Sequence, residues 1–322
     1  MCKEIGSEFH HMPIEHGKGI EFPKEGTLVF SGRTAIEAVL KKLPFARSAT
    51  LPSYCCDSMI EPFRRAGIEI CYFDVNYKNG LDIHIDKKTD ILLFSNYFGC
   101  KTKLPDFDGI IIEDITHSLL SDYQYHPQSN YFVASLRKWE PIYCGGYCSI
   151  QMDGLLPPKE FIQGKKNPMN LKTQYLKEPD EKTKITFLKE FNESNAWLEK
   201  NYSGLLIDPY SKEYVSLADI KTQKSIRRRN AHILYNGLKD NYQFLFPEED
   251  MDCPLFVPII VKDKKRDKVR QRLIDHRIYC PVHWPHPKAE CQSNLYDIEL
   301  SLICDQRYTV EDMERIISVL CD

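Results

Sequence analysis

Four short apolar runs follow one another in the first half of the chain and predict buried strands. They are IEICYFDV (68–75), DILLFSN (90–96), GIIIED (109–114) and NYFVAS (130–135). Nearly continuous apolar runs of this length are typical of strands buried on both faces of a mostly parallel sheet. A further short strand, SATL, is expected to end at Pro52. The pattern therefore predicts an α/β fold with a central sheet flanked by helices.

Apolar residues at helical spacing mark the segments between and after these strands. The first helix follows Ser31-Gly32 and carries Ala35, Ile36, Val39, Leu40 and Leu43 on its apolar face. The stretch 152–182 is polar and rich in Pro and Lys, so we expect an irregular surface segment there. Further helices are expected at 54–66, 183–200, 216–239 and 263–276, and from Thr309 onward, with Asp312 placed as in a capping box.

Length and a change of pattern predict two domains. The chain has 322 residues, and a prior of roughly 150 residues per domain gives about two. After residue 250, strands expected at 255–261, 278–284 and 297–303 alternate with helices, which is typical of a smaller α+β unit. We predict a large domain at 29–224 and a small C-terminal domain at 225–322, which also holds the N-terminal segment 1–28.

Composition argues against several classes of function. The net charge is −3, so there is no basic excess for binding nucleic acid or an anionic membrane. No apolar run reaches the roughly 18 residues of a membrane span, and the N-terminus lacks the apolar core of a signal peptide. A cytoplasmic protein is therefore expected. The twelve cysteines are irregularly spaced and form no CxxC pair, so we expect mostly buried free thiols rather than disulfides or a zinc ribbon.

Several common catalytic and nucleotide-binding motifs are absent from the sequence. It contains no GxGxxG after a strand, no GxxxxGK[ST], no GxSxG and no HExxH. His283 and His286 form an HxxH pair. Two histidines without a matching carboxylate or thiolate pattern are weak evidence for a metal site. A metal-dependent hydrolase that uses this pair stays an open but less favoured alternative.

Three features in a fixed order point to a cofactor site at one edge of the sheet. The turn Ser31–Thr34 opens the first helix, Asp114 ends a predicted strand with His117 three residues on, and SLRKW (135–139) follows the next strand. Ligands of open α/β sheets bind at the C-terminal ends of strands. A helix N-terminus also attracts phosphate through its backbone N–H groups and its dipole.

A lysine, a carboxylate and a phosphate cradle are what pyridoxal 5′-phosphate (PLP) requires. Lys138 would form the Schiff base with this cofactor, and Asp114 would keep the pyridine nitrogen protonated, so that the ring can accept electrons. Lys138 would also move the proton during transamination. That role needs a lysine pKa lowered by burial or by a cationic neighbour, and Arg137 is such a neighbour in sequence.

These residues resemble the DegT/DnrJ/EryC1/StrS family, the sugar-nucleotide-type aminotransferases of the aspartate aminotransferase superfamily. The resemblance implies fold type I of the PLP-dependent transferases, with a mostly parallel central sheet and a smaller C-terminal α+β domain. The segments IIEDITHS and SLRKW are its strongest part. The matching segments, in family order, are EIGSEF (4–9), FSGRTAIEAVL (30–40), LPSYCCDSMIEPF (51–63), SNYFG (95–99), IIEDITHSLLSD (111–122), ASLRKW…GGY (134–147), RRRNAHILYNGL (227–238) and QRYTVEDMERI (306–316).

The resemblance assigns roles to individual positions. Lys138 matches the internal-aldimine lysine, Asp114 matches the pyridinium partner, and His117 lies where the family places a residue near the cofactor's 3′-oxygen. The family's ring-stacking aromatic is not evident after Pro52. Other implied cofactor contacts are Gly32, Arg33, Thr34 and Ser135 at the phosphate, and Tyr54 and Cys56 near the ring; the implied substrate contacts are Tyr97 and His283.

The implied function is amino transfer, with glutamate as donor and the keto group of a nucleotide-linked sugar as acceptor. The family's active site lies at a subunit interface, so a homodimer with shared sites is expected. The alternative is a PLP-binding protein of the same fold with other chemistry, such as dehydration, or with a regulatory or binding role. Family dehydratases carry histidine in place of the lysine, so Lys138 favours the aminotransferase.

Overall fold

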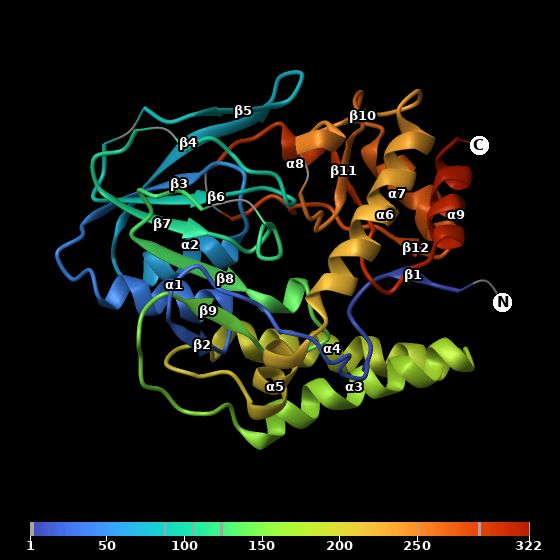
Figure 1. The fold of residues 1–322 in the computed structure, drawn as a ribbon, viewed down its shortest axis with the longest axis horizontal. Coiled ribbons are helices and arrows are strands. Elements are labelled where there is room, and N and C mark those ends of the chain that lie inside the picture. The colour runs from blue at the N-terminus through green and yellow to red at the C-terminus, as the bar shows by residue number, and fades with distance from the viewer. Residues whose placement is uncertain are drawn as a thin grey trace. The chain divides into compact units, whose positions relative to one another are not determined.

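The computed structural model describes residues 3–86, 88–104, 106–122, 125–250, 252–288 and 291–321 (Figure 1). The described chain forms two compact units. The first comprises Glu8–Pro44 and Tyr131–Ile220, with Lys3, and the second comprises Glu4–Ser7, Phe45–Asn130 and the residues from Lys221 onward. The domain boundaries expected from the sequence, 29–224 and 225–322, stay a prediction.

The first unit contains a small antiparallel sheet that carries the first helix. β9 (Gly146–Cys148) pairs on one side with β2 (Thr27–Val29) and on the other with β8 (Tyr131–Ser135). The helix α1 (Gly32–Lys41) follows β2 and buries Ala35, Ile36, Val39 and Leu40, as its spacing predicts. The strand expected at 130–135 is thus confirmed, whereas β2 and β9 are too short to show a periodicity of their own.

A long helical hairpin occupies the stretch where the sequence predicts irregular structure. The expectation for 152–182 is wrong, because α3 spans Lys159–Lys177 and packs against α4 (Glu181–Lys200) (Figure 1). Pro168 lies inside α3, and proline normally ends a helix. The helix persists because it buries an apolar stripe against its partner. That stripe joins Met169 and Tyr175 of α3 to Phe187 and Phe191 of α4.

The helix expected from residue 216 is also divided. The chain forms α5 (Pro209–Leu217) and then α6 (Ile220–Leu238). Asp208 caps α5 by accepting a hydrogen bond from the Ser211 backbone N–H at 3.1 Å. Ala218, with an extended ψ of 140°, ends that helix. The cap and Pro209 at the first helical position are start signals that the apolar periodicity alone does not show.

The second unit contains the predicted parallel strands. Their spatial order is β7-β6-β3-β4, with β5 antiparallel at the edge. The strands expected at 68–75, 90–96 and 109–114 are confirmed. β5 was not expected, and it pairs with β4 through a turn at Asn79-Gly80, where both residues have positive φ. The bounds are β3 Ser48–Pro52, β4 Glu69–Tyr77, β5 Leu81–His84, β6 Ile91–Ser95 and β7 Ile110–Asp114.

The helix of this unit that follows β3 begins later than predicted. α2 spans Asp57–Arg65 rather than 54–66, because Cys56 is the N-cap and has an extended backbone. Tyr54 and Cys55 therefore lie in the connection between β3 and α2. This connection places the Tyr54 side chain inside the unit, where it is fully buried.

A smaller antiparallel sheet and its helices form the rest of the second unit. The order is β10-β11-β13, and β1 pairs separately with β12. The strand expected at 278–284 is wrong beyond Tyr279, because Pro281 and Pro285 cannot donate ladder hydrogen bonds. The bounds are β1 Ile5–Gly6, β10 Gln243–Phe244, β11 Val257–Ile260, α7 Arg266–Asp275, β12 Ile278–Tyr279, α8 Leu295–Ile298, β13 Glu299–Leu302 and α9 Val310–Cys321.

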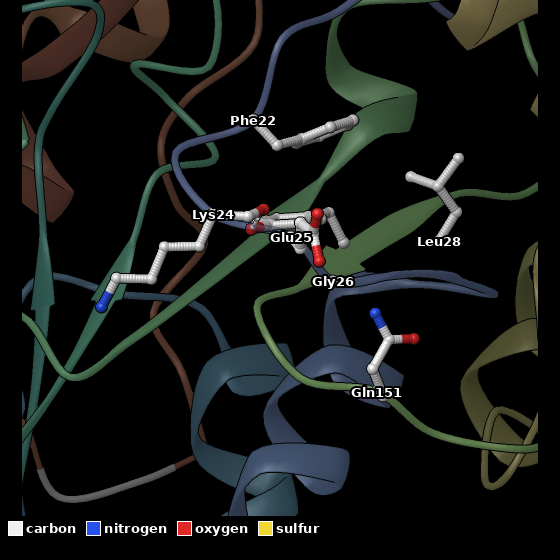
Figure 2. Close-up of a pocket in the computed structure, with 7 residues that line it drawn as sticks. Phe22, Lys24, Glu25, Gly26, Leu28 and Gln151 are labelled. Carbon is white, nitrogen blue, oxygen red and sulfur yellow. Dashed lines mark hydrogen bonds between the residues drawn. The ribbon is translucent and has the colours of Figure 1, made fainter.

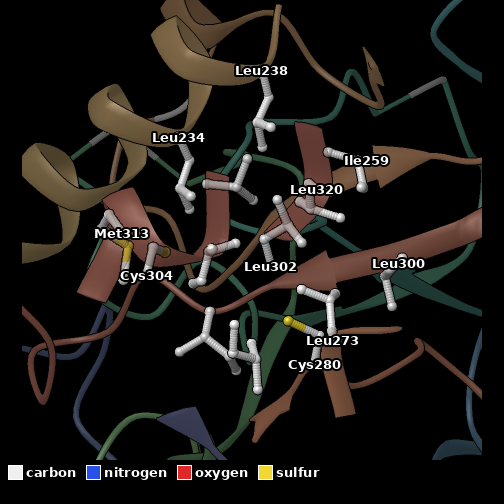
Figure 3. Packing of buried hydrophobic residues seen from close by; sticks show 14 of the residues in the cluster. Leu234, Leu238, Ile259, Leu273, Cys280, Leu300, Leu302, Cys304, Met313 and Leu320 are labelled. Atoms are coloured by element: carbon white, nitrogen blue, oxygen red, sulfur yellow. The ribbon is translucent and has the colours of Figure 1, made fainter. Parts of the chain in front are cut away.

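One apolar core binds these last elements together. Figure 3 shows Leu300 and Leu302 of β13 packing with residues of α6, α7 and α9. The predicted capping box of α9 is confirmed, since the Thr309 N–H donates to Asp312 at 3.0 Å and the Asp312 N–H donates to Thr309 at 3.4 Å. The described cysteines carry free thiols, and most of them are buried. Among the described residues, no helix has the length and apolar character needed to cross a membrane.

We predict that Leu302→Ala lowers the free energy of unfolding by about 2–5 kcal/mol, because the fully buried leucine would leave a cavity in this core. Urea denaturation followed by circular dichroism measures the change. Leu155→Ala is the matched control, since Leu155 is 75% exposed and its truncation should change stability by less than about 0.5 kcal/mol. Equal effects of the two substitutions would contradict the assignment of the core.

Candidate functional site

Lys138 lies on a short helix that its neighbours hold in place. β8 ends at Ser135, and the 3-10 helix η1 (Leu136–Lys138) follows directly. Leu136 and Trp139 are fully buried on either side of the half-buried lysine. The Leu136 N–H also donates to the Gly145 carbonyl at 3.1 Å. These contacts anchor the backbone at Lys138, so the lysine lies just past the end of a strand, as the sequence predicts.

The turn at the start of α1 lies directly against the end of β8. A Cβ atom at Gly32 would lie 3.2 Å from the Ser135 Cβ, so a side chain at this position would make a tight contact with Ser135. Ser31 is the N-cap of α1, and its Oγ accepts a hydrogen bond from the Thr34 N–H at 3.2 Å. Gly32 and Ser135, both expected to contact phosphate, are thereby brought together.

The glycine pair after the lysine completes this arrangement. The Gly145 N–H donates to the Phe30 carbonyl at 2.7 Å. A Cβ at Gly146 would lie only 2.3 Å from the Ser31 carbonyl oxygen, so no side chain fits there. The sequence shows the two glycines, but only the fold shows that they are needed for the Ser31 turn to lie on β9.

The side chains of Thr34 and Arg33 are engaged elsewhere in the first unit. Thr34 Oγ1 donates to the Tyr202 carbonyl at 2.8 Å, and the Arg33 guanidinium lies 3.6 Å from the Glu199 carboxylate. Their contribution to phosphate binding stays a prediction. Because both side chains have other partners, the backbone N–H groups of the turn are better placed for such a contact. The N–H groups of the first turn lie at the positive end of the dipole of α1.

Arg137, the neighbour of Lys138, belongs to a buried charged network. Burial, together with the positive charge of Arg137, lowers the pKa of Lys165 to about 8. Lys165 Nζ donates to Asn195 Oδ1 at 2.5 Å, and Asn195 donates to Glu8 at 3.0 Å. Burial alone would raise the pKa of Glu8, yet Lys165 and Arg137 hold it below its ordinary value. The positive charge of Arg137 beside Lys138 therefore interacts electrostatically with the Glu8 carboxylate.

In the second unit, Asp114 and His117 lie at the end of β7. Asp114 is the last residue of that strand and is nearly buried. One of its oxygens, Oδ1, accepts a hydrogen bond from the Thr116 N–H at 2.9 Å. His117 Nδ1 accepts a hydrogen bond from the Phe98 N–H at 3.4 Å. Because Nδ1 accepts, the neutral imidazole carries its proton on Nε2.

Aromatic side chains surround His117. The Trp284 indole stacks on the His117 ring at 5.4 Å between centroids and an angle of 28°. Tyr54 packs on Trp284 at 4.9 Å, and Tyr97 donates a hydrogen bond from its hydroxyl to the Tyr54 carbonyl at 2.8 Å. Burial raises the pKa of both tyrosines well above the ordinary value. Tyr54, Tyr97 and His117, three of the predicted site residues, therefore lie in one cluster.

Trp284 is a member of the cluster that the sequence patterns do not single out. A stacking aromatic was expected after Pro52, but the indole comes from the distant segment that precedes α8. The Tyr54 ring is tilted relative to the rings of Tyr97, Trp284 and Tyr296 rather than stacked on them. Cys56 is half-buried, with its Sγ 2.8 Å from the Ser58 hydroxyl, and its contact with a cofactor stays a prediction.

His283, the second predicted substrate residue, joins the same cluster. Its ring lies 5.5 Å from that of His117, at nearly a right angle. The Nδ1 atom of His283 is 2.7 Å from the Ser301 hydroxyl, and the His283 N–H donates to Glu299 Oε2 at 2.8 Å. The Ser301 hydroxyl also lies within hydrogen-bond distance of the other oxygen of Glu299. No motif in the sequence marks Ser301 or Glu299.

The predicted residues thus form two groups, one in each unit. Gly32, Ser135 and Lys138 belong to the first unit, and Asp114 with the aromatic cluster belongs to the second. The pairing of Lys138 with Asp114 stays a prediction. For the HxxH pair, His286 lies 3.0 Å from Asp297 and both are exposed. Within the residues that the structure describes, no group of three His, Cys, Asp or Glu side chains is placed to hold a metal ion.

An open pocket of about 480 Å³ lies on the first unit beside β2 and β9 (Figure 2). Phe22 stacks on Tyr147 at its wall, with 4.2 Å between ring centroids. None of the predicted cofactor or substrate residues lines this pocket. Its lining residues are Phe22, Lys24, Glu25, Gly26, Leu28, Tyr147 and Gln151.

Sequence comparison identifies no relative, but the fold has clear counterparts. No family model matches the chain, and no curated protein matches it in sequence. The sugar aminotransferase CalS13 from Micromonospora echinospora superposes with a TM-score of 0.63 at 13% identity, over 92% of this chain and 86% of that one. A DegT DnrJ EryC1 StrS aminotransferase from Brucella abortus gives 0.61 at 14%, over 94% and 86%. This chain has the fold of the sugar aminotransferases.

A dehydratase shares the same architecture. The E. coli GDP-4-keto-6-deoxy-D-mannose-3-dehydratase, solved with bound hydrated PLP, superposes with a TM-score of 0.58 at 14% identity, over 92% of this chain and 88% of that one. The α/β fold type I architecture implied by the sequence resemblance is therefore confirmed. At these identities the likeness concerns the fold alone.

We predict that Gly146→Ala lowers the free energy of unfolding by about 1–3 kcal/mol, because the new methyl group would displace the Ser31 turn. Thermal unfolding of the purified variant measures the change. Gly164→Ala in α3 is the matched control, since its Cβ would meet nothing closer than 3.9 Å and alanine favours the helix by up to about 1 kcal/mol. A Gly146→Ala protein as stable as wild type would contradict the close packing of turn and strand.

Proposed function

We propose that this chain is a PLP-dependent aminotransferase that transfers the amino group of glutamate to the keto group of a nucleotide-linked sugar. One observation carries the proposal: in a chain with the sugar-aminotransferase fold, the Gly32 turn meets Ser135 at the strand end that leads into Lys138. The arrangement joins a candidate phosphate site to a candidate covalent lysine, three residues apart along the chain.

The residues present fit the cofactor. Its phosphate would bind where the first turn of α1 meets Ser135, because a side chain at Gly32 would occupy that space. Its aldehyde would react with Lys138. Its ring nitrogen would be held by Asp114, with His117 beside the 3′-oxygen and Tyr54 and Trp284 as aromatic contacts. When bound, the cofactor supplies an electron sink for the electrons released at the substrate's Cα.

Each residue then has a chemical role of its own. Lys138 Nζ would take the proton from the Cα of the amino donor and return it to the acceptor carbon, as general base and then general acid. The Asp114 carboxylate would hold a proton on the ring nitrogen by charge-assisted hydrogen bonding. The positive charge of Arg137, the sequence neighbour of Lys138, would disfavour a second positive charge there.

The donor and the acceptor are proposed from the structural counterparts of the fold. CalS13 is a sugar aminotransferase, and the E. coli dehydratase takes its name from a nucleotide-linked keto-sugar. Tyr97 and His283, in the cluster around His117, are the proposed substrate contacts. Both offer polar atoms in an aromatic setting, which suits a hydroxyl-rich ring.

The dehydratase among the structural counterparts supports elimination chemistry as a second candidate function. In this alternative the chain binds PLP but performs elimination from a related sugar, or serves a binding role without turnover. Lys138 argues against the dehydratase, because that branch of the family carries histidine at the corresponding position. The two functions differ in whether glutamate converts the cofactor to its amine form.

We predict that the purified protein shows the visible absorbance of lysine-bound PLP, and that glutamate bleaches it as pyridoxamine phosphate forms. Lys138→Ala should abolish both the native band and amine formation, because it removes the covalent attachment and the proton carrier. Absorbance spectroscopy with chromatographic detection of pyridoxamine phosphate measures both. Lys212→Ala, a substitution of an exposed lysine on α5, is the matched control and should retain the wild-type response.

Each outcome separates the functions. A band that glutamate leaves unchanged would overturn the glutamate-dependent aminotransferase and favour elimination chemistry, which GDP-4-keto-6-deoxy-mannose as substrate then tests. Absence of PLP binding would overturn both and leave only the shared fold. If glutamate forms pyridoxamine phosphate, its consumption on adding a keto-sugar nucleotide identifies the acceptor.

We also predict a homodimer, since active sites of this fold are built between subunits. Light scattering at micromolar concentration should give about twice the chain's 37.6 kDa. A monomer under these conditions would contradict the prediction. The cytoplasmic location expected from the sequence likewise stays a prediction.

A further inference from the structure

β13 has one apolar and one polar face, and both are fully buried. Leu300 and Leu302 point into the core of the C-terminal elements (Figure 3). Glu299 and Ser301 alternate with them, so they share the opposite face of the strand. Each of the two polar residues has no measurable exposure. Burying a glutamate side chain in this way costs free energy unless its polar atoms are paired. The hydrogen-bond partners of Glu299 therefore matter for the role of this strand.

The partners of Glu299 form a chain that ends at His283. The Glu299 carboxyl uses one oxygen to accept the His283 backbone N–H and the other to contact the Ser301 hydroxyl. The same hydroxyl lies 2.7 Å from His283 Nδ1. A third contact fixes this geometry, since the Ser301 N–H donates to the Pro281 carbonyl at 3.1 Å. An unbroken line of hydrogen bonds therefore joins a buried carboxyl to an imidazole.

Among the described residues, no cation forms an ion pair with the Glu299 carboxyl. Burial raises the pKa of Glu299 to about 8, although its hydrogen bonds and the Arg266 charge oppose the rise. Arg266 reaches the backbone carbonyl of Glu299 instead, at 3.1 Å. Tyr54 and Cys280 are the other titratable groups close to the carboxyl. The surroundings of Glu299 therefore favour its protonated form at neutral pH.

The outer end of the line faces the aromatic cluster. The His283 ring contacts His117, Trp284, Phe98 and Phe256, and the side chain is nearly buried. Within this cluster, His117 is the titratable side chain that packs on the His283 ring. His283 therefore links the buried carboxyl to the residues proposed to meet the substrate.

We propose that Glu299, Ser301 and His283 form a proton relay that makes His283 Nε2 an acid–base group for an oxygen atom of the substrate. The proposal deepens the function proposed above, on which it rests for the identity of that substrate. Glu299 and Ser301 act through His283 and are positioning and proton-carrying residues. His283 is the group that touches the substrate.

The proton balance of the relay is closed. Acting as an acid, neutral His283 gives its Nε2 proton to the substrate oxygen, and an O–H bond forms there. Ser301 passes its proton to His283 Nδ1, and Glu299 replaces the proton on Ser301, which leaves Glu299 as a carboxylate. When an amine nitrogen replaces a keto oxygen, that oxygen leaves as water and must gain protons to do so. Glu299 recovers its proton by the reverse path, when His283 Nε2 acts as a base and takes a proton from water or from the substrate.

The experiment follows His283 directly in the cofactor-free 322-residue protein. Side-chain nitrogen NMR of the 15N-histidine-labelled protein is recorded from pH 6 to 10, with the His283 signals assigned by their loss in His283→Gln. We expect a transition of the His283 nitrogens near pH 8 in wild type, when Glu299 ionises. Glu299→Gln, which keeps the shape and hydrogen-bonding capacity but cannot release a proton, should lack it.

Two further variants test the link itself. Ser301→Ala should remove the transition from His283, and Ser301→Thr, which retains the hydroxyl, should preserve it. If Glu299→Gln does not fold, this pair decides alone. A His283 titration that is the same in wild type, Glu299→Gln and Ser301→Ala would overturn the relay, whatever the enzyme's activity.

Activity gives an independent readout. The rate of keto-sugar amination in wild type should fall at least tenfold from pH 7 to pH 9, as the relay loses its proton. In Glu299→Gln the rate should be lower at pH 7 and should lack this alkaline limb. A normal NMR transition without amination would contradict the proposed function and leave the relay standing. Amination with an unchanged pH profile in Glu299→Gln would overturn the relay and leave the function standing.

Discussion

The candidate cofactor site depends on backbone segments that approach one another too closely for side chains. The carbonyl of Ser31 lies where a Cβ of Gly146 would be, and Gly32 lies against Ser135. These two contacts bring the start of α1, the end of β8 and the strand β9 together in the first unit. Lys138 follows within the same short segment, held by the buried Leu136 and Trp139. The glycine contacts are therefore sufficient to keep the spacing between the proposed phosphate site and Lys138.

In both units, burial shifts the pKa of charged side chains, and neighbouring charges and hydrogen bonds offset the shift only in part. Lys165 is buried near Arg137, and the negative charge of the Glu8 carboxylate acts on both of these cations. Glu299 is buried with hydrogen bonds but with its nearest arginine directed at a backbone oxygen. As a result, the pKa values of Lys165 and Glu299 both lie close to neutral pH. Such groups exchange protons readily near neutral pH, which suits the amino transfer proposed above.

Two particular segments show where sequence patterns mislead. The stretch from 152 to 182 is polar and contains several prolines, yet α3 forms there because its apolar stripe packs on α4. The segment IYCPVHW looks like a strand, yet pairing ends after Tyr279 and the remainder turns to bring His283 and Trp284 into the aromatic cluster. In both cases tertiary contacts outweigh local propensity.

Local patterns along the chain were enough to predict the α/β class, the parallel strands of the second unit, the first helix after Ser31, and the capping box of the last helix. They also placed Lys138 and Asp114 at strand ends. Such features depend on periodicity and on side chains that bond to backbone a few residues away, so each is visible in a short stretch of sequence. The stacking of Trp284 on His117 and the line from Glu299 to His283 arise only once the chain is folded. They join residues far apart in sequence, and on β13 they bury a polar face that alternation would assign to solvent.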